Sequence, residues 1–193
     1  MNKIQLLKEN ISPIISLSEE ELTALSEVFE FKIIKKNDFF LKENQVCNYI
    51  GLLVSGALIY VKTLDNSDEA TIHFAFEGDW VNNTLSRLNN TPSAISIKAI
   101  EDTGILIIKQ SDINNLYLKI PKTERLGRIL TEQAFIKFVE QSIEFQTMTA
   151  KQRYENLLNN YPGIFKKVQL YHIASYLGIA PKSLSRIRKE VFE

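Results

Sequence analysis

The spacing of apolar residues changes from a helical to a strand pattern near residue 30. Ser18 and Glu21 have the spacing of a helix capping box. Apolar residues follow at helical intervals, namely Leu22, Leu25, Val28 and Phe29. This pattern predicts a short helix at about 18–29. From Phe31 to about Lys109 the chain consists of short runs rich in Ile, Val, Phe and Tyr. Turn-forming residues separate these runs: Lys36-Asn37-Asp38, Ser55-Gly56, Asp65-Asn66-Ser67, Glu77-Gly78-Asp79 and Asp102-Thr103-Gly104. Many short strands with regular turns predict a jelly-roll barrel.

A long helix is predicted after the barrel. Pro121 suits the first turn of a helix, and the chain continues to Thr147 without another proline, over about 40 Å at 1.5 Å per residue. Isoleucines recur every seven positions, at Ile129, Ile136 and Ile143. A second apolar face carries Ala134, Phe138 and Phe145. We expect one face to pack on the barrel and the isoleucine face to pair with a second copy of the chain. The alternative is a single buried core helix.

Two short amphipathic helices are predicted at the C-terminal end, between Leu170 and Val191. Each has one apolar stripe: Leu170, Ile173, Ala174 and Leu177 in the first, and Leu184, Ile187 and Val191 in the second. Between them Gly178 supplies a residue that tolerates positive φ, and Ile179 can fill the angle between the helices. Ala174 is small where the second helix would cross. This combination is typical of a helix-turn-helix.

The outward face of the second helix is rich in hydrogen-bond donors. Pro181 suits its first turn, and no acidic residue follows until Glu190. The candidate DNA-binding residues on this face are Lys182, Ser183, Ser185, Arg186, Arg188 and Lys189. We expect Arg186 to contact a guanine edge, and Arg188 and Lys189 to contact phosphates. The alternative is an ordinary helical hairpin with a solvated basic face.

The charge distribution supports binding to a polyanion. Residues 149–193 carry eight basic and three acidic side chains, a net charge of +5, whereas the preceding 148 residues carry −5. Basic side chains that contact phosphates release counterions from DNA, which favours binding. The zero net charge of the whole chain therefore conceals a basic C-terminal module.

Composition excludes several classes of function. A hydrophobic content of 45% in 193 residues is sufficient for a folded core. The single cysteine, Cys47, excludes an internal disulfide and a metal site built from several thiolates. A cupin-like metalloenzyme would need two or three histidines inside the barrel, where only His73 occurs. We therefore expect no enzyme activity, metal or cofactor. With no signal-peptide pattern and no apolar run of membrane-spanning length, we expect a cytoplasmic protein without membrane contact.

Two segments resemble the Crp/Fnr family of transcription regulators. Leu17 through Lys62 looks like the opening of a cyclic-nucleotide-binding jelly roll. The segment from Ala174 to Lys189, ASYLGIAPKSLSRIRK, is similar to the recognition hairpin of a Bacteroidetes-type branch of that family. The resemblance implies a homodimer formed through the long helix, an inverted-repeat operator in double-stranded DNA, contact with RNA polymerase, and a base-reading role for Arg186.

The resemblance also locates the candidate effector-binding residues: Gly78, Asp79, Ser93 and Ala94. Members that bind cyclic AMP hold its phosphate with a G-E pair and a later R-S or R-T pair. Here Gly78-Asp79 stands in place of the first pair, and Pro92 stands where the arginine would be. A buried phosphate would lose a charge-assisted bidentate bond without that arginine, so we do not expect cyclic AMP to bind. Arg87 and Lys98 are near in sequence, but nothing in the sequence places either in the pocket. A small-molecule effector, a cyclic nucleotide and a vestigial pocket remain as alternatives.

Four further side chains have specific expectations. Asn37 and Asn44 stand at turns where the family has glycine, and asparagine tolerates the left-handed region. Trp80 is expected in the core rather than stacked on a ligand, and Cys47 as a small buried hydrophobe. His172 is expected at the surface or near a phosphate.

Together these patterns predict an α+β protein. Residues 1–120 would form an N-terminal jelly-roll sensor domain, residues 121–148 a dimerisation helix, and residues 149–193 a winged-helix-like helix-turn-helix domain that binds DNA.

Overall fold

The strands of this protein form two four-stranded antiparallel sheets that face each other. In the computed structural model, which describes residues 2–192, the first sheet has the order β1-β8-β3-β6 and the second has the order β2-β7-β4-β5. The strands are β1 (Glu30–Ile34), β2 (Phe39–Leu41), β3 (Tyr49–Ser55), β4 (Ala57–Thr63), β5 (Glu69–Phe76), β6 (Trp80–Val81), β7 (Ser96–Ala99) and β8 (Thr103–Lys109). The jelly-roll prediction is confirmed.

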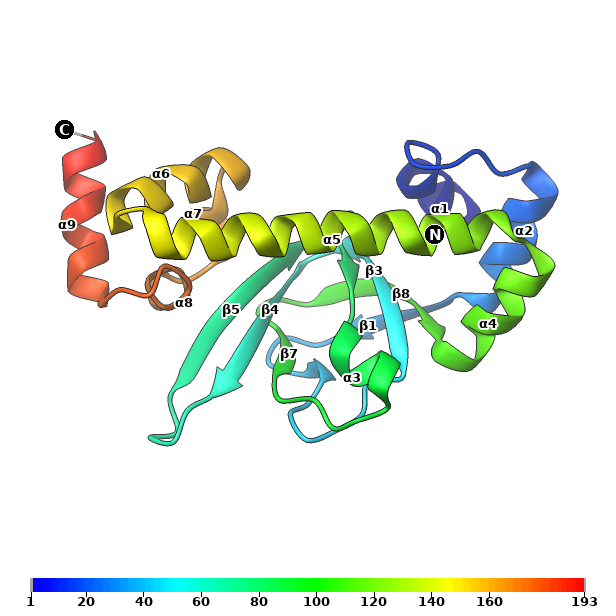
Figure 1. Cartoon of the computed structure of the whole chain (residues 1–193), viewed down its shortest axis with the longest axis horizontal. Coiled ribbons are helices and arrows are strands. Elements are labelled where there is room, and N and C mark those ends of the chain that lie inside the picture. The colour runs from blue at the N-terminus through cyan, green and yellow to red at the C-terminus, as the bar shows by residue number, and fades with distance from the viewer. Residues whose placement is uncertain (1, 193) are drawn as a thin grey trace.

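Helices cover the sheets and continue beyond them (Figure 1). They are α1 (Lys3–Ile11), α2 (Glu19–Val28), α3 (Thr84–Asn89), α4 (Gln110–Lys119), α5 (Lys122–Thr147), α6 (Ala150–Asn160), α7 (Ile164–Lys167), α8 (Leu170–Tyr176) and α9 (Pro181–Phe192). The 26-residue helix α5 runs along the barrel, with α1, α2 and α4 towards one end and α6 to α9 at the other. The predicted α+β class and long helix are confirmed. After β8 the described residues contain helices only, so the strands of a wing are not among them.

Neighbouring residues in the central strands alternate between different cores. Leu53 and Ile105 point between the sheets, where they pack with Leu58 of the second sheet. The adjacent Leu52 and Leu106 point to the opposite face of the first sheet. Helices α1, α2, α4 and the start of α5 bury that outer face. Because both faces are covered, these strands are apolar at successive positions instead of alternating with polar residues.

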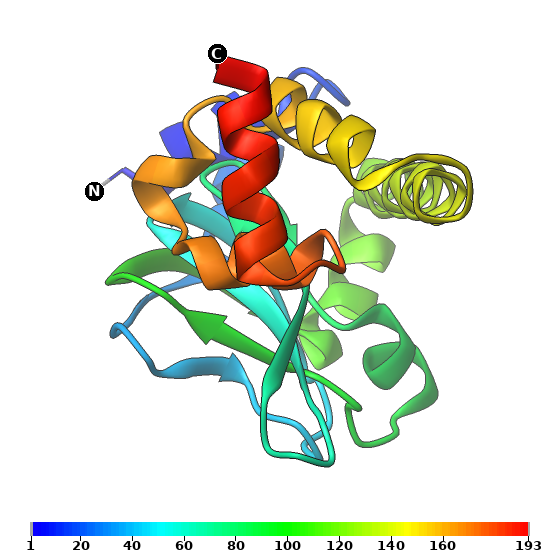
Figure 2. The same cartoon turned by 90° about the vertical axis from the view of Figure 1, so that its left-hand side faces the viewer.

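The second sheet buries its outer face against the C-terminal helices. Ile59 and Val61 of β4 and Phe74 of β5 share one core with buried residues of the helical module. Those residues are Tyr154, Leu157, Ile164, Val168, Ile173, Ala174, Leu177, Leu184 and Ile187. Figure 2 shows the helices α6 to α9 clustered over the end of the barrel. The helical module (residues 150–192) is therefore attached to the barrel by a continuous apolar core as well as by α5.

Several local expectations are confirmed. Ser18 and Glu21 form the reciprocal bonds of a capping box at the start of α2. Asn37 and Asn44 adopt positive φ, at 71° and 67°. Trp80 packs in the core, with its ring centroid 6.2 Å from that of Phe29. The Cys47 side chain is buried.

The sequence patterns did not predict α1, α3, α4, α6 or α7. Between residues 2 and 192, no helix combines the length and the apolar character needed to cross a bilayer.

Candidate nucleic-acid interface and effector region

Helices α8 and α9 form a tight hairpin. Gly178 has φ of +67°, and the backbone N–H of Ile179 donates to the carbonyl of Ala174 over 3.0 Å. Ala174 is fully buried, and Leu184 and Ile187 of α9 pack in the same core. The predicted stripes are therefore buried, except for Leu170, which is exposed at the first residue of α8. A Cβ atom added at Gly178 would lie 3.3 Å from the Phe145 ring, so the turn abuts the end of α5.

The outward face of α9 presents most of the predicted donors to solvent. Lys182, Ser185, Arg186 and Lys189 are exposed, whereas Ser183 is half-buried. The Arg186 side chain is 77% exposed, and its Nε lies 3.8 Å from Glu190 Oε1, one helical turn away. Such an exposed pair is worth about 0–1 kcal/mol, so it leaves Arg186 free to exchange this partner for another.

Arg188 is placed differently from the other donors. Its guanidinium lies over the ring of Phe165, 4.7 Å from the centroid, and its Nε is buried. Arg188 therefore links α9 to the segment around α7. The helical pattern missed this contact because Phe165 lies outside the hairpin.

The middle of α5 has an exposed apolar surface. All residues from 131 to 140 are exposed in the single chain. Ile136 and Ile143 are 55% and 53% exposed, as an unpaired interface requires, whereas Ile129 is half-buried against the barrel core. Phe135 and Phe138, 65% and 66% exposed, extend this surface, and Phe135 did not belong to either predicted face. Neighbouring apolar residues that are exposed together on a soluble chain indicate a binding surface.

Gly78 and Asp79 form the turn between β5 and β6. Gly78 has φ of +90°, and Asp79 Oδ2 accepts a 2.8 Å hydrogen bond from the backbone N–H of Phe76. The backbone groups of both residues bond to Leu53 of β3. These contacts account for the Gly-Asp pair by the geometry of the turn.

Ser93 belongs to a different network. It is buried and accepts a 2.8 Å hydrogen bond from the Asn83 side chain, which also caps the start of α3. The neighbouring Ala94 is exposed. No described hydrogen bond joins this network to Gly78 or Asp79, so the structure does not bring the four predicted effector residues into one cluster. The sequence reasoning missed Asn83, whose signal was a capping residue just before a short helical segment.

The two basic side chains near the pocket in sequence have other partners. Arg87 Nη1 donates to Gln110 Oε1 over 2.5 Å and so ties α3 to the start of α4. Lys98 pairs with Glu69 at 3.5 Å and lies over the ring of Phe39. Neither cation bonds to Ser93 in the structure.

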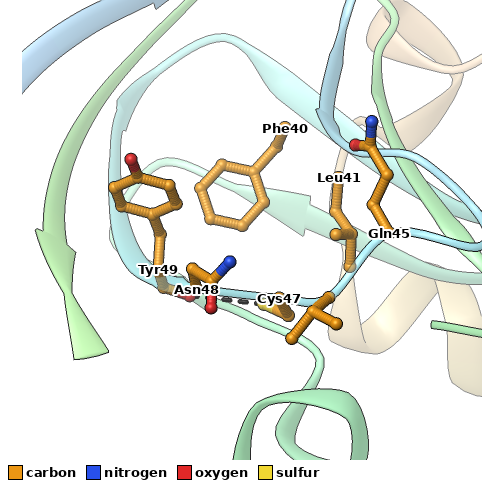
Figure 3. Close-up of a pocket in the computed structure, with 7 residues that line it drawn as sticks. Phe40, Leu41, Gln45, Cys47, Asn48 and Tyr49 are labelled. Carbon is orange, nitrogen blue, oxygen red and sulfur yellow. Dashed lines mark hydrogen bonds between the residues drawn. The ribbon is translucent and has the colours of Figure 1, made fainter. Parts of the chain in front are cut away.

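A cavity of about 370 Å³ lies beside this region (Figure 3). Its lining contains no charged side chain and consists of Phe40, Leu41, Gln45, Val46, Cys47, Asn48 and Tyr49. The backbone N–H of Cys47 donates to Ser86 Oγ on α3, and the N–H of Ser93 donates to the carbonyl of Gln45. The cavity wall is therefore bonded to α3 and to the loop that carries Ser93. None of the four predicted effector residues lines the cavity.

The expected surface position of His172 is wrong. This histidine is only 4% exposed, and its Nδ1 lies 2.9 Å from Thr71 Oγ1 on β5. The helical module docks on β5 through this side of α8, which removes His172 from solvent. Burial is the main cause that lowers the pKa of His172, with a smaller lowering from Lys98 and an opposing effect of Glu69.

Comparison with known proteins now adds to this geometry. Residues 31–119 match the family model for the cyclic nucleotide-binding domain. FixK2 from Bradyrhizobium japonicum superimposes with a TM-score of 0.74 and 17% identity, covering 86% of this chain and 85% of FixK2. A CooA mutant from Carboxydothermus hydrogenoformans gives a TM-score of 0.69 and 16% identity, covering 98% of this chain and 84% of CooA. These neighbours are Crp/Fnr transcription regulators. The chain has the Crp/Fnr fold.

A third Crp/Fnr neighbour is CLP of Xanthomonas campestris, described as a regulator responsive to cyclic di-GMP. It has a TM-score of 0.70 and 10% identity, covering 90% of this chain and 91% of CLP. No curated protein sequence matches the chain. The Crp/Fnr resemblance expected from the sequence is thus confirmed at the level of fold.

The docking of His172 generates a prediction about pH. Burial also lowers the pKa of His73, so both histidines should be neutral in the folded protein at pH 7. The unfolded chain then binds more protons as the pH falls below about 6.5, and the free energy of unfolding should decrease. Urea unfolding at pH 7.5 and pH 5.5 measures this decrease. Titration of the two imidazole NMR signals assigns it, and a His172 pKa at or above its ordinary value would contradict the buried placement.

Proposed function

We propose that this protein is a dimeric, sequence-specific DNA-binding transcription regulator of the Crp/Fnr type. The observation that carries the proposal is the exposed donor face of α9, whose apolar side is buried in the helical module. A rigid helix with an exposed row of Lys, Arg and Ser side chains has the chemistry to enter a major groove. The net charge of +5 on residues 149–193 supports binding to the phosphate backbone.

Within α9, the proposal assigns different roles to different donors. Arg186 would read a base, Lys182, Ser183 and Ser185 would contact the groove near the start of α9, and Lys189 would contact a phosphate. Arg188 packs on Phe165, so its main contribution would be to orient α9. The operator would be an inverted repeat in double-stranded DNA, because a two-fold dimer presents two such helices. Contact with RNA polymerase would make the protein act on transcription, in the cytoplasm.

The dimer would form along α5. Ile136 and Ile143 are exposed seven residues apart, and Phe135 and Phe138 widen the apolar surface. A second copy of the same helix offers the same repeat and can bury it. Ile129 would contribute less, because it already packs against the barrel.

Substitution of Ile136 should abolish the dimer. A glutamate at this position would place two like charges in a desolvated interface, one from each copy. We expect Ile136→Glu to sediment as a monomer at micromolar concentrations at which the wild type is a dimer. Leu118→Glu is the matched control, because Leu118 is exposed on α4 outside the proposed interface. A monomeric wild type would refute the α5 interface.

Base-reading and phosphate-contacting residues of α9 should behave differently. Arg186→Ala should cost about 1–3 kcal/mol on the cognate operator and much less on random DNA, because it removes a base contact. Lys189→Ala should weaken both DNAs alike and reduce the salt dependence by about one per phosphate contact. Binding to sequences selected from a random library, followed by titrations at several salt concentrations, measures both effects. An unchanged consensus for Arg186→Ala would contradict its role.

The barrel is proposed as an effector sensor that does not bind cyclic AMP. No arginine precedes Ser93, Ser93 is bonded to Asn83, and Arg87 and Lys98 have other partners. A cyclic-nucleotide-responsive regulator is the second candidate, because residues 31–119 match the cyclic nucleotide-binding domain. The response of CLP to cyclic di-GMP adds that ligand to those worth testing.

Calorimetric titration distinguishes these candidates. We expect cyclic AMP to give no measurable heat at millimolar concentration, because a buried phosphate would have no partner of opposite charge. Cyclic GMP and cyclic di-GMP are titrated in parallel. A micromolar dissociation constant for cyclic AMP would favour the second candidate, and Arg87→Gln would then test whether this arginine has replaced the missing one.

A further inference from the structure

A two-residue link joins the proposed dimer helix to the helical module. Helix α5 ends at Thr147 and α6 begins at Ala150. The intervening Met148 and Thr149 both have extended backbones, with ψ of 146° and 159°. A change in the dihedral angles of these two residues would swing the whole module relative to α5. The orientation of α9 therefore depends on contacts made elsewhere.

Some contacts lie close to this link. Arg153 donates to the carbonyls of Met148 and Leu177, over 2.7 Å and 2.9 Å. The Asn156 side chain donates to Glu144 over 3.0 Å. Arg153 and Asn156 are on the first two turns of α6, so they act near the pivot and have little leverage against rotation of the distant α9.

A second set of contacts holds α8 on β5, and we name it the β5 latch: Thr71, Phe74, His172, Ser175 and Tyr176. The backbone N–H of Thr71 donates to Ser175 Oγ over 2.8 Å, and Thr71 Oγ1 lies 2.9 Å from His172 Nδ1. The rings of Phe74 and Tyr176 are 4.8 Å apart. Thr71, Phe74 and His172 are all buried, so the latch excludes water.

The latch acts on α9 through the hairpin. Only residues 177–180 separate α8 from α9, and the two helices share one core. Figure 1 shows α8 beside β5, at the end of α5 that carries the helical module. The position of α8 on β5 thus sets the angle between α9 and α5.

We propose that the β5 latch determines the spacing of operator half-sites that the dimer accepts. This inference rests on the proposed function, in which two chains pair along α5 and each inserts α9 into a major groove. Half-sites one helical turn apart require the two helices to be about 34 Å apart. That separation depends on the angle between α9 and α5 in each chain. Thr71, a barrel residue, thereby becomes a positioning residue for DNA recognition.

Operators with altered spacing test the proposal. The pair of changes Thr71→Val and Ser175→Ala removes both hydroxyls of the latch, and Thr71→Ser is the matched control that keeps the hydroxyl. The selected inverted repeat is lengthened or shortened by single base pairs at its centre. We expect the wild type and Thr71→Ser to lose about tenfold or more in affinity per step, corresponding to about 1.4 kcal/mol. The Val/Ala variant should bind the best operator more weakly and discriminate less between spacings, with its base preference within each half-site unchanged.

A measurement without DNA tests the latch itself. Spin labels on Lys36→Cys in the barrel and Lys166→Cys in the helical module, both exposed positions, report the distance between the two parts. Cys47→Ser removes the native thiol, and dilution with unlabelled protein isolates distances within one chain. The distance distribution should be narrow with Thr71→Ser and broad with the Val/Ala pair, while circular dichroism verifies that both variants are folded.

The outcomes separate this inference from the proposed function. A wild type that binds no DNA would overturn the regulator assignment and the spacing proposal with it, and the distance distribution would still show whether the latch holds the module. An unchanged distribution together with an unchanged spacing profile would overturn the latch. Tighter binding of the Val/Ala variant at every spacing would also overturn the proposal, because the latch would then restrain α9 instead of positioning it.

Discussion

The burial of both faces of the second sheet is the constraint on which the rest of the structure depends. Leu58 and Ala75 point between the sheets, whereas their neighbours Ile59 and Phe74 point outward. Without a cover, that outward face would expose apolar surface, at a cost of about 25 cal/mol for each Å². The helical module supplies the cover with Ile173, Leu184 and other residues of its own core. The part that carries the candidate DNA-binding helix is therefore also part of the packing of the barrel.

This shared core links the position of α9 to the barrel without a long pathway. Thr71 on β5 contacts His172 and Ser175 on α8, and α9 follows after a four-residue connection. A change in β5 would move α8 as a packed unit, because close-packed side chains transmit displacement instead of absorbing it. The apolar surface around Ile136 on α5 lies between the two parts along the chain. Dimerisation, DNA contact and the barrel thus meet at the two ends of one helix.

The effector region shows how polar groups can be satisfied without a ligand phosphate. Ser93 bonds to Asn83, and the N–H of Asn83 lies 3.4 Å from Cys47 Sγ. Ser86 of α3 accepts from the Cys47 backbone and donates to Thr91. Buried polar groups that already have partners gain little from an added anion, and an anion without a cation would be costly to bury. The neighbouring uncharged cavity has the same electrostatic character.

The sequence by itself determined features that depend on neighbours along the chain. The capping box at Ser18, the positive φ of Asn37, Asn44 and Gly178, and the length of α5 follow from local backbone and side-chain chemistry. The apolar stripes of α8 and α9 followed from helical periodicity, and their opposite faces defined the candidate DNA-binding residues.

Only the tertiary structure decided which of those surfaces are free. Periodicity could not show that Arg188 packs on Phe165 or that His172 is buried on Thr71, because those partners are distant in sequence or belong to another element. It also could not separate Gly78 and Asp79, which form a turn against Leu53, from Ser93, which is bonded to Asn83. A residue's type and spacing fix the face of its own element. What that face meets depends on how elements far apart in the chain pack, because the energy of burial has no direction and is satisfied by any apolar partner.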